Sequence, residues 1–459
     1  MAGGSSGPGG PSRRALLSGA AAAGAAWLAP GRAFAVDPRE APPIVFAHGN
    51  GDHAALWMTQ LWRFESNGWP RDRLTAFNFS DPLARSDDSV PQPGRSSTED
   101  QRRELAEAIR QTQERTGAEK VAVVAASRGA NAARSYAADP AGAAALSHLV
   151  LCGGPNHGVF ATDANLGSEF NGRSLFLSRL NAGEVETPRG VPTLTLRSEG
   201  YDKFAQPDGA TFGRPGLVTG VDEFGPALRG ATNIALGRLD HREVAFHARA
   251  FREIFRFVTA QEPARLSVVP EAQPVLDGLV TGFPKATPTN RPLADATVEI
   301  WRTDPDTGGR RGDPIHQKIT GPDGRWGPVT VKPDWTLEFV ITAPGHPATH
   351  IYRSPFLRST GVLHLRPGRP IDKKDAGAAA IVTMSRPRGY FGRPRDVVLL
   401  DGREPGDVTP GVPTDSVATV RLGAQDMERP IVAVFNDERI VGRGWPAAEA
   451  RITILELTW

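Results

Sequence analysis

The sequence predicts an α/β fold, with a mostly parallel sheet and flanking helices, followed by an all-β C-terminal region. In the first part, between residues 41 and 259, apolar runs typical of buried strands alternate with amphipathic helical stretches. This order favours parallel strands joined by crossover helices. In the second part, after residue 261, short alternating runs are separated by Pro, Gly and Asp turns. That pattern indicates a β sandwich or barrel.

The first 35 residues predict an export signal. Arg13 and Arg14 precede an apolar stretch that ends at Leu28, and residues 33–35 have the small-x-small pattern of a cleavage site. Because this is the order of a twin-arginine signal, we expect cleavage after Ala35 and a periplasmic or secreted protein. An uncleaved membrane anchor or an unstructured tail is the alternative.

Charge and cysteine content exclude some classes of protein. The 459 residues include 53 Lys and Arg against 51 Asp and Glu, so the charges nearly balance. The composition therefore does not indicate nucleic acid or an anionic membrane as the main partner. The single cysteine, Cys152, cannot form an intramolecular disulfide. We expect it to be a small buried apolar residue.

The first predicted strand, Ile44 to Ala47, leads into the glycine-rich loop of residues 48–51. Acyl transfer through a tetrahedral intermediate needs two backbone N–H groups that bind the oxyanion, and a loop at this place supplies one of them. By position, the donors are the amides of Asn50 and Arg128. A phosphate-binding loop is the alternative, but no Gly-Lys-Ser/Thr sequence follows.

A helix is predicted between Ser97 and Lys120, with a capping box formed by Thr98 and Gln101. The apolar run 121–124 then ends in Ala125-Ala126-Ser127-Arg128-Gly129-Ala130. A serine in so tight a strand-to-helix turn, flanked by small residues, matches the nucleophile elbow of serine hydrolases. The variant with Ala125 in the first small position resembles the elbow of small bacterial lipases.

A carboxylate that orients a catalytic imidazole belongs at the end of a strand beyond the nucleophile. The strand predicted at residues 191–196 leads to Asp202, which is the preferred acid. Asp163, Glu199 and Asp208 are alternatives.

The strand predicted at residues 232–236 is followed by His241 and then by an amphipathic helix from Val244 to Val258. A histidine in this loop can reach the serine, so His241 is the preferred base. His157, in the turn after the strand at 149–152, is an alternative that we expect to be architectural. His247 is expected to lie within the helix and to pack or face solvent.

Together these residues resemble the α/β-hydrolase superfamily, and within it bacterial lipases and esterases, over roughly residues 41–259. The resemblance implies Ser127 as nucleophile, His241 as general base and Asp202 as the residue that orients it. It also implies an oxyanion hole formed by Asn50 and Arg128, with no metal or organic cofactor. Arg128 departs from the uncharged residue frequent in lipases, and its side chain could narrow or charge the pocket.

Residues 157–190 form an apolar insertion before the strand that leads to the acid. It is expected to be a lid or a wall of an acyl pocket, or else a helix that packs on the sheet.

Strands are predicted in the C-terminal region at residues 297–301, 336–341 and 397–400, with a turn at 321–324. Parts of the region resemble the transthyretin-like or carboxypeptidase-regulatory sandwich. The predicted organisation is a signal (1–35), a catalytic domain (36–262), a β sandwich (263–370) and a further β-rich region (371–459). The spacing of four histidines, at positions 316, 346, 350 and 364, argues against a zinc site.

A hydrolase followed by a β-rich tail is similar to two-domain lipases of archaea and bacteria. The similarity implies that the tail shapes an acyl tunnel or contacts a lipid or polymer surface. A spacer without ligand is the alternative. The sequence therefore predicts an exported serine hydrolase of carboxylic esters, with lipid-like or polyester substrates. An amidase or peptidase with the same triad, and a non-catalytic surface-binding protein, are the alternative functions.

Overall fold

The computed structural model describes residues 37, 40–209, 216, 218–284, 287–427 and 429–459, which belong to one compact unit. The predicted export signal lies outside these residues. No helix in the described part of the chain combines the length and the apolar character needed to cross a lipid bilayer.

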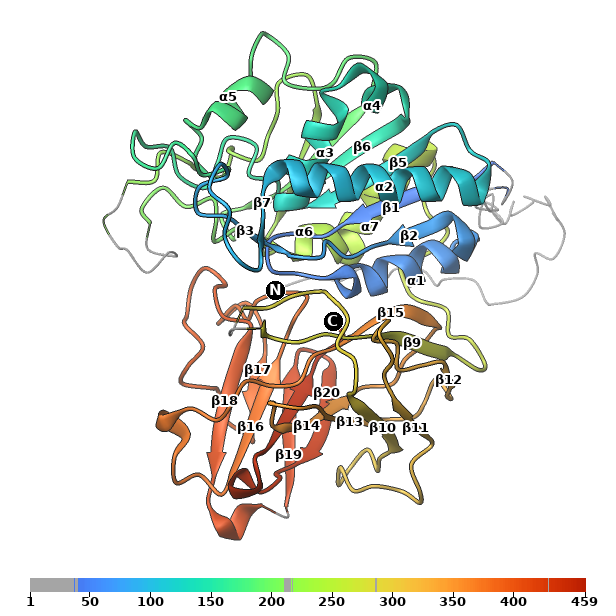
Figure 1. Ribbon diagram of the computed structural model, residues 1–459, viewed down its shortest axis with the longest axis vertical. Coiled ribbons are helices and arrows are strands. Elements are labelled where there is room, and N and C mark those ends of the chain that lie inside the picture. Colours follow the sequence, from blue (N-terminus) through green and yellow to red (C-terminus); the bar gives the residue numbers. More distant parts are fainter. Residues whose placement is uncertain (1–36, 38–39, 210–215, 217, 285–286, 428) are drawn as a thin grey trace, which may run out of the picture. The chain divides into compact units, whose positions relative to one another are not determined.

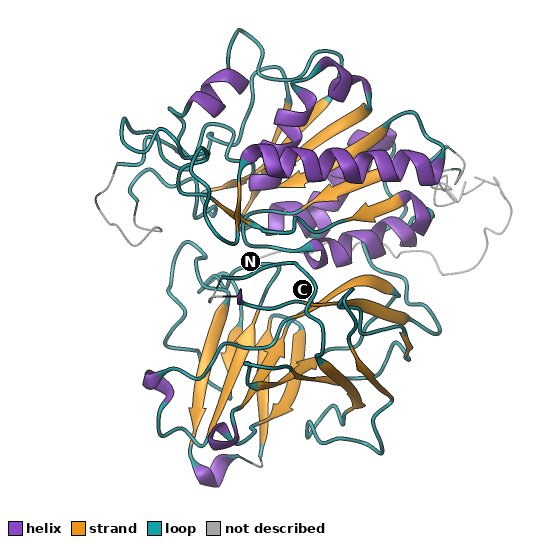
Figure 2. Cartoon of the chain, viewed as in Figure 1, coloured by secondary structure: helices purple, strands orange, loops and turns teal. Residues whose placement is uncertain are grey.

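A six-stranded parallel sheet forms the centre of the N-terminal half, and helices cover both of its faces (Figures 1 and 2). The strand order is β2-β1-β5-β6-β7-β8. The strands are β1 (Ile44–Ala47), β2 (Leu74–Ala76), β5 (Val121–Ala126), β6 (Leu146–Cys152), β7 (Thr193–Glu199) and β8 (Thr232–Gly237). All neighbouring pairs are parallel. The predicted α/β class is therefore confirmed.

The helices of this half are α1 (Met58–Ser66), α2 (Thr98–Thr116), α3 (Arg128–Ala137), α4 (Pro140–Ala144), α5 (Leu175–Leu180), α6 (Glu243–Phe246) and α7 (Ala248–Thr259). Short 3-10 helices span Ala54–Trp57 and Arg71–Arg73, and β3 (Leu83–Ala84) pairs with β4 (Arg95–Ser96). One buried cluster joins α1 and α7 to the sheet, and another joins α2 and α3 to it. β1 and β5 are buried along their whole length, whereas the edge strands β2 and β8 are partly exposed. Burial on both faces explains the continuous apolar sequences of β1 and β5.

Two local predictions for the helices were wrong. The capping box of α2 is formed by Ser97 and Asp100, one residue earlier than expected. The helix expected from Val244 to Val258 is broken at His247, whose backbone is extended (ψ 153°) and whose ring Nδ1 accepts a hydrogen bond from the Arg249 amide. His247 therefore caps α7 instead of lying within a helix.

The C-terminal half is built mostly of β-sheet, as predicted (Figure 2). A seven-stranded mixed sheet has the order β11-β10-β13-β14-β21-β16-β18, and two three-stranded sheets have the orders β12-β9-β15 and β17-β19-β20. The strands are β9 (Val275–Val280), β10 (Thr297–Arg302), β11 (His316–Ile319), β12 (Val329–Thr330), β13 (Leu337–Thr342), β14 (Ala348–Arg353), β15 (Thr360–Leu365), β16 (Ala380–Ser385), β17 (Val398–Leu400), β18 (Val417–Leu422), β19 (Pro430–Phe435), β20 (Glu438–Arg443) and β21 (Arg451–Glu456). Short 3-10 helices span Lys373–Asp375, Ala424–Asp426 and Ala447–Glu449.

Two buried clusters form the interior of this half. One cluster joins strands between residues 276 and 365 and includes Met58 and Trp62 of α1. The other joins residues 380–457 and includes Tyr352. Because α1 contributes to the first cluster, the β-rich half packs directly against the α/β half. The domain boundaries predicted near residues 262 and 370 are not tested by this packing and stay predictions.

Candidate active site

Ser127 lies in the tight turn between β5 and α3, with a strained backbone conformation (φ 50°, ψ −124°). Its N–H donates a hydrogen bond to the Cys152 carbonyl of the neighbouring strand, at 2.8 Å. The turn depends on two close-packed glycines: a Cβ at Gly49 would come within 2.8 Å of Ser127 Cβ, and one at Gly129 within 2.6 Å of the His48 carbonyl oxygen. The small residues at these positions therefore permit a non-glycine residue to hold positive φ.

His241 and Asp202 meet at the carboxyl end of the same sheet. His241 follows β8, Asp202 follows β7, and the histidine Nδ1 lies 2.8 Å from Asp202 Oδ2. Both side chains are buried. The other Asp202 oxygen accepts a hydrogen bond from the Phe204 amide, and the Phe204 ring packs edge-on against the imidazole. These contacts fix the orientation of the imidazole.

The remaining ring nitrogen of His241, Nε2, is buried and has no hydrogen-bond partner within the described ranges. His241 and Ser127 line one cavity of about 100 Å³. A buried histidine nitrogen without a partner is costly in a folded protein, and such groups occur where chemistry needs them. The structure therefore brings together the three residues that the sequence analysis proposed as a triad.

Of the two predicted oxyanion donors, one lines this cavity and the other directly follows Ser127. Asn50 lines it, and its side-chain Oδ1 accepts a hydrogen bond from the Ala84 amide, which fixes the loop. Arg128 is the first residue of α3, where a backbone N–H has no acceptor within the helix. The positive end of the helix dipole also favours a negative charge at this point.

The Arg128 side chain is completely buried and is not among the residues that line the cavity. Its guanidinium bonds Glu169 Oε1 at 2.6 Å, and Ser96 Oγ and the Ser96 carbonyl oxygen at 2.9 and 2.7 Å. Burial raises the pKa of Glu169, and the Arg128 charge opposes that rise. The concern that Arg128 charges the pocket is therefore wrong, because the side chain instead anchors the 157–190 insertion to the elbow.

The alternative acids and bases lie elsewhere. Asp163, Glu199 and Asp208 are exposed. His157 has both ring nitrogens occupied, by the Gly225 carbonyl oxygen at 2.8 Å and by Glu186 Oε1 at 2.9 Å. This agrees with the architectural role expected for it.

The insertion consists mainly of loops and the short α5, and it supplies one wall of the cavity. Its contributions to the cavity are Val159 and Phe170, with Pro155 just before them. Of the three roles predicted for the 157–190 insertion, a lid, a pocket wall or a helix packed on the sheet, these contacts support the pocket wall.

Three polar cavity residues were missed by the sequence analysis: Asp52, Arg242 and Tyr390. Arg242 Nη2 lies 2.8 Å from Asp52 Oδ1, and its guanidinium stacks on the Tyr390 ring at 4.9 Å. Burial raises the pKa of Asp52 against the effect of Arg242, and burial raises the pKa of Tyr390 to about 12. Asp52 and Arg242 each adjoin a predicted site segment, whereas no local signal marks Tyr390.

A residue of the β-rich half holds the loop that carries Asn50. Asn290 is buried, and its Nδ2 donates hydrogen bonds to the carbonyl oxygens of Asp52 at 2.8 Å and Phe79 at 2.9 Å. Its Oδ1 accepts a hydrogen bond from Arg366 at 3.0 Å. The β-rich half therefore contributes to the position of the loop.

Two histidines of the β-rich half have packing partners. His350 bonds Glu338 and stacks on Trp445, and His364 bonds Thr281 and stacks on His53. Across the described ranges, no group of three or more His, Cys, Asp or Glu side chains is arranged to hold a metal ion. Cys152 is buried as a free thiol, and burial raises its pKa.

Two family models match the chain. Residues 41–143 match the family described as lipase (class 2), and residues 273–370 match the lipase C-terminal domain. No curated protein matches the chain.

Similar solved structures include an Aspergillus fumigatus lipase B (15% identity, TM-score 0.35, 49% of this chain and 54% of the other). A Bacillus licheniformis lipase in its propeptide form has 19% identity and a TM-score of 0.35, covering 59% of each chain. The mature form of that lipase has 20% identity and a TM-score of 0.34, covering 49% of this chain and 94% of the other. The chain thus spans less than two thirds of the first two proteins.

Proposed function

We propose that this chain, whose α/β half matches the class 2 lipase model and whose β-rich half matches the lipase C-terminal domain, hydrolyses carboxylic esters through a Ser127-His241-Asp202 triad. The observation that carries the proposal is the free imidazole nitrogen. Among the residues that the structure describes, His241 Nε2 is buried without a hydrogen-bond partner at the cavity that Ser127 lines, while Asp202 holds the opposite nitrogen. This is the arrangement that a general base needs before substrate binds.

In the proposed reaction, Ser127 Oγ attacks the ester carbonyl carbon while His241 Nε2 accepts the hydroxyl proton. The amides of Asn50 and Arg128 bind the oxyanion of the tetrahedral intermediate. Collapse of the intermediate breaks the bond to the alcohol, which leaves with the proton from His241. Water then attacks the acyl-enzyme by the same route, releasing the acid and restoring Ser127.

The test is hydrolysis of ethyl butyrate by the full chain without residues 1–35, followed in a pH-stat. Ser127→Ala is expected to lower kcat by at least about 10³-fold, as loss of a nucleophile does. Ser147→Ala, a half-buried serine of β6, is the matched control and should keep full activity. Equal rates for the two variants would contradict the proposal.

Substrate and compartment belong to the same proposal. Lipid-like ester substrates are supported by the lipase-family matches, and polyesters are a second candidate class. Twin-arginine export is supported by the sequence of residues 12–35. Rates on a matched ester and anilide would separate an esterase from an amidase. Replacement of Arg13 and Arg14 by Lys should retain the protein in the cytoplasm, and unchanged export would rule out the twin-arginine route.

For the β-rich half, we propose contact with a lipid or polymer surface. Cosedimentation of the full chain with phosphatidylglycerol vesicles or polyhydroxybutyrate granules tests this, and recovery of all the protein in the supernatant would contradict it.

A further inference from the structure

Tyr390 reaches the candidate active site from a part of the chain that neither matched family domain covers. It lies in the connection between β16 and β17, within residues 371–459. Even so, it is one of the residues that line the cavity with Ser127 and His241.

One buried carboxylate fixes Tyr390 relative to His241. Asp240, the residue before His241, uses Oδ1 to accept hydrogen bonds from the Arg242 and Glu243 amides, at 2.8 and 2.9 Å. Its Oδ2 accepts a hydrogen bond from the Tyr390 amide at 2.7 Å. The loop of the proposed base and the loop of Tyr390 are therefore tied to the same side chain.

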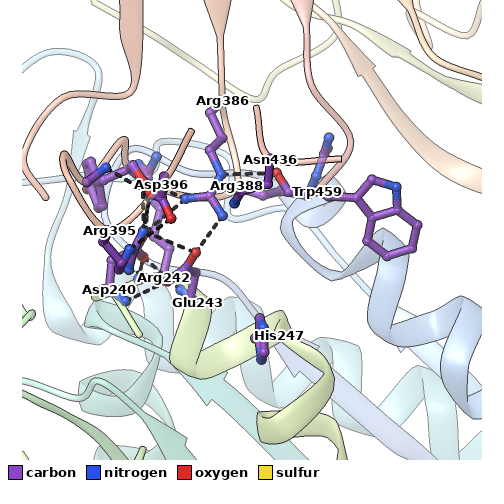
Figure 3. Close-up of polar contacts among 12 residues, drawn as sticks. Asp240, Arg242, Glu243, His247, Arg386, Arg388, Arg395, Asp396, Asn436 and Trp459 are labelled. Carbon is purple, nitrogen blue, oxygen red and sulfur yellow. Dashed lines mark hydrogen bonds and ion pairs between the residues drawn. The ribbon is translucent and has the colours of Figure 1, made fainter. Parts of the chain in front are cut away.

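Two arginines of the β-rich half reinforce this tie (Figure 3). Arg386 pairs with Asp240 at 3.0 Å and Glu243 at 2.6 Å, and its Nη1 also bonds the Tyr390 carbonyl oxygen at 2.6 Å. Arg395 pairs with Glu243 at 2.7 Å. Buried charges are tolerated only when they are fully paired, and such networks select a single arrangement. The position of Tyr390 is thus well defined.

The Tyr390 side chain is held by contacts to its ring, which leaves its hydroxyl available. Arg242 and Lys203 lie over the ring, at 4.9 and 4.6 Å from its centroid. Within the described residues, no group forms a hydrogen bond with the hydroxyl, and because the pKa of Tyr390 is about 12, this hydroxyl is a hydrogen-bond donor at neutral pH.

The cavity lining contains both apolar and polar side chains. Pro155, Val159, Phe170 and Phe204 are apolar, and Asp52, Arg242 and Tyr390 are polar. Its volume of about 100 Å³ is below the roughly 300–1,000 Å³ usual for ligand pockets. It is also below the roughly 150 Å³ of a cavity that binds benzene. A space of this volume suits a short acyl chain.

We propose that Tyr390 is a specificity-determining residue that closes the acyl pocket and, with Asp52 and Arg242, selects short hydroxyacyl esters. A hydroxyl on the acyl chain accepts a hydrogen bond from the Tyr390 hydroxyl and donates one to Asp52, whereas an alkyl chain leaves the Tyr390 hydroxyl unpaired. The apolar side chains contact the hydrocarbon part of the chain. This inference rests on the proposed function of Ser127.

The test compares kcat/KM of the full mature chain for three esters: ethyl 3-hydroxybutyrate, ethyl butyrate and ethyl octanoate. The wild type is expected to prefer the hydroxylated ester to ethyl butyrate by about tenfold or more, the value of one net hydrogen bond. Tyr390→Phe should remove most of this preference. Tyr390→Ala, which also removes the ring, should raise the octanoate-to-butyrate ratio by about tenfold.

Ratios between substrates measured on one preparation do not depend on the fraction of protein that is folded. Tyr136→Phe, on α3 and away from the cavity lining, is the matched control and should leave both ratios unchanged. Equal wild-type rates on the two four-carbon esters, or a preference that survives Tyr390→Phe, would overturn the inference. Fluorophosphonate labelling separates the two proposals: a labelled wild type without the preference refutes only the role of Tyr390, whereas an unlabelled wild type refutes the proposed function.

Discussion

Replacing Asn290 by Asp should impair the proposed reaction from outside the α/β half. In the wild type, Asn290 Nδ2 lies 2.8 and 2.9 Å from the carbonyl oxygens of Asp52 and Phe79. The change is nearly isosteric, but it replaces this donor by an oxygen that faces both carbonyl oxygens. Each buried acceptor left unpaired costs about 1–3 kcal/mol, so the two together cost roughly 2–6 kcal/mol. Arg366, at 3.0 Å from Oδ1, offsets part of this cost.

That free energy favours displacement of the loop that carries Asn50, because the Asp52 carbonyl lies two residues beyond it. Loss of one oxyanion donor lowers kcat by about 10²- to 10³-fold with a small change in KM. The assay is steady-state hydrolysis of ethyl butyrate, together with thermal unfolding to show that the variant is folded.

Asn436→Asp is the matched control for this change. Asn436 lies in the same β-rich half, and the interaction of its side chain is made by Oδ1, which accepts a hydrogen bond from the Val397 amide. Aspartate keeps that acceptor, so this variant should retain wild-type kcat. A folded Asn290→Asp variant with unchanged kcat would refute the argument that the β-rich half positions the loop.

Three further predictions concern the elbow and its surroundings. Gly49→Ala places a Cβ 2.8 Å from the side chain of the proposed nucleophile and should lower kcat at least tenfold. In the control Gly361→Ala, the new Cβ meets no atom within 4 Å, so kcat should not change. Equal rates for the two variants would contradict this prediction. Glu169→Gln leaves the buried Arg128 guanidinium without its carboxylate and should lower the free energy of unfolding by about 3–5 kcal/mol in urea titrations, and a loss below 1 kcal/mol would count against the pair. Burial lowers the pKa of His48 from 6.5 to about 4. The folded state therefore binds fewer protons than the unfolded state, so the contribution of His48 to the free energy of unfolding is fully present above pH 6.5. About 3 kcal/mol of that free energy should be lost between pH 7 and pH 4. A His48→Gln variant that loses the same amount would show that another group is responsible.

The sequence predicted those features that depend on short segments. Val121 to Ala126 is apolar throughout because the strand is buried on both faces, and the small residues around Ser127 are required by its positive φ. The break at His247 was missed because the apolar periodicity continues across it, while its cause is the capping of α7 by the imidazole. Local sequence carries no such signal.

The polar lining of the cavity could not be predicted for a different reason. Asp52 and Arg242 are close in space to Tyr390 through contacts such as that of Asp240 with the Tyr390 amide, which join segments far apart in the sequence. The same holds for Asn290 and the loop it supports. One sequence without its fold does not show which of many polar residues in β-region loops make such contacts.

The most direct test of the proposed triad is to map a fluorophosphonate adduct by mass spectrometry. We expect a single adduct on the peptide that contains Ser127. His241→Ala should slow its formation by at least about 10³-fold, while His346→Ala, a partly exposed histidine of the β-rich half, should not change it. An adduct on another residue, or undiminished labelling of Ser127 in the His241→Ala variant, would contradict the account.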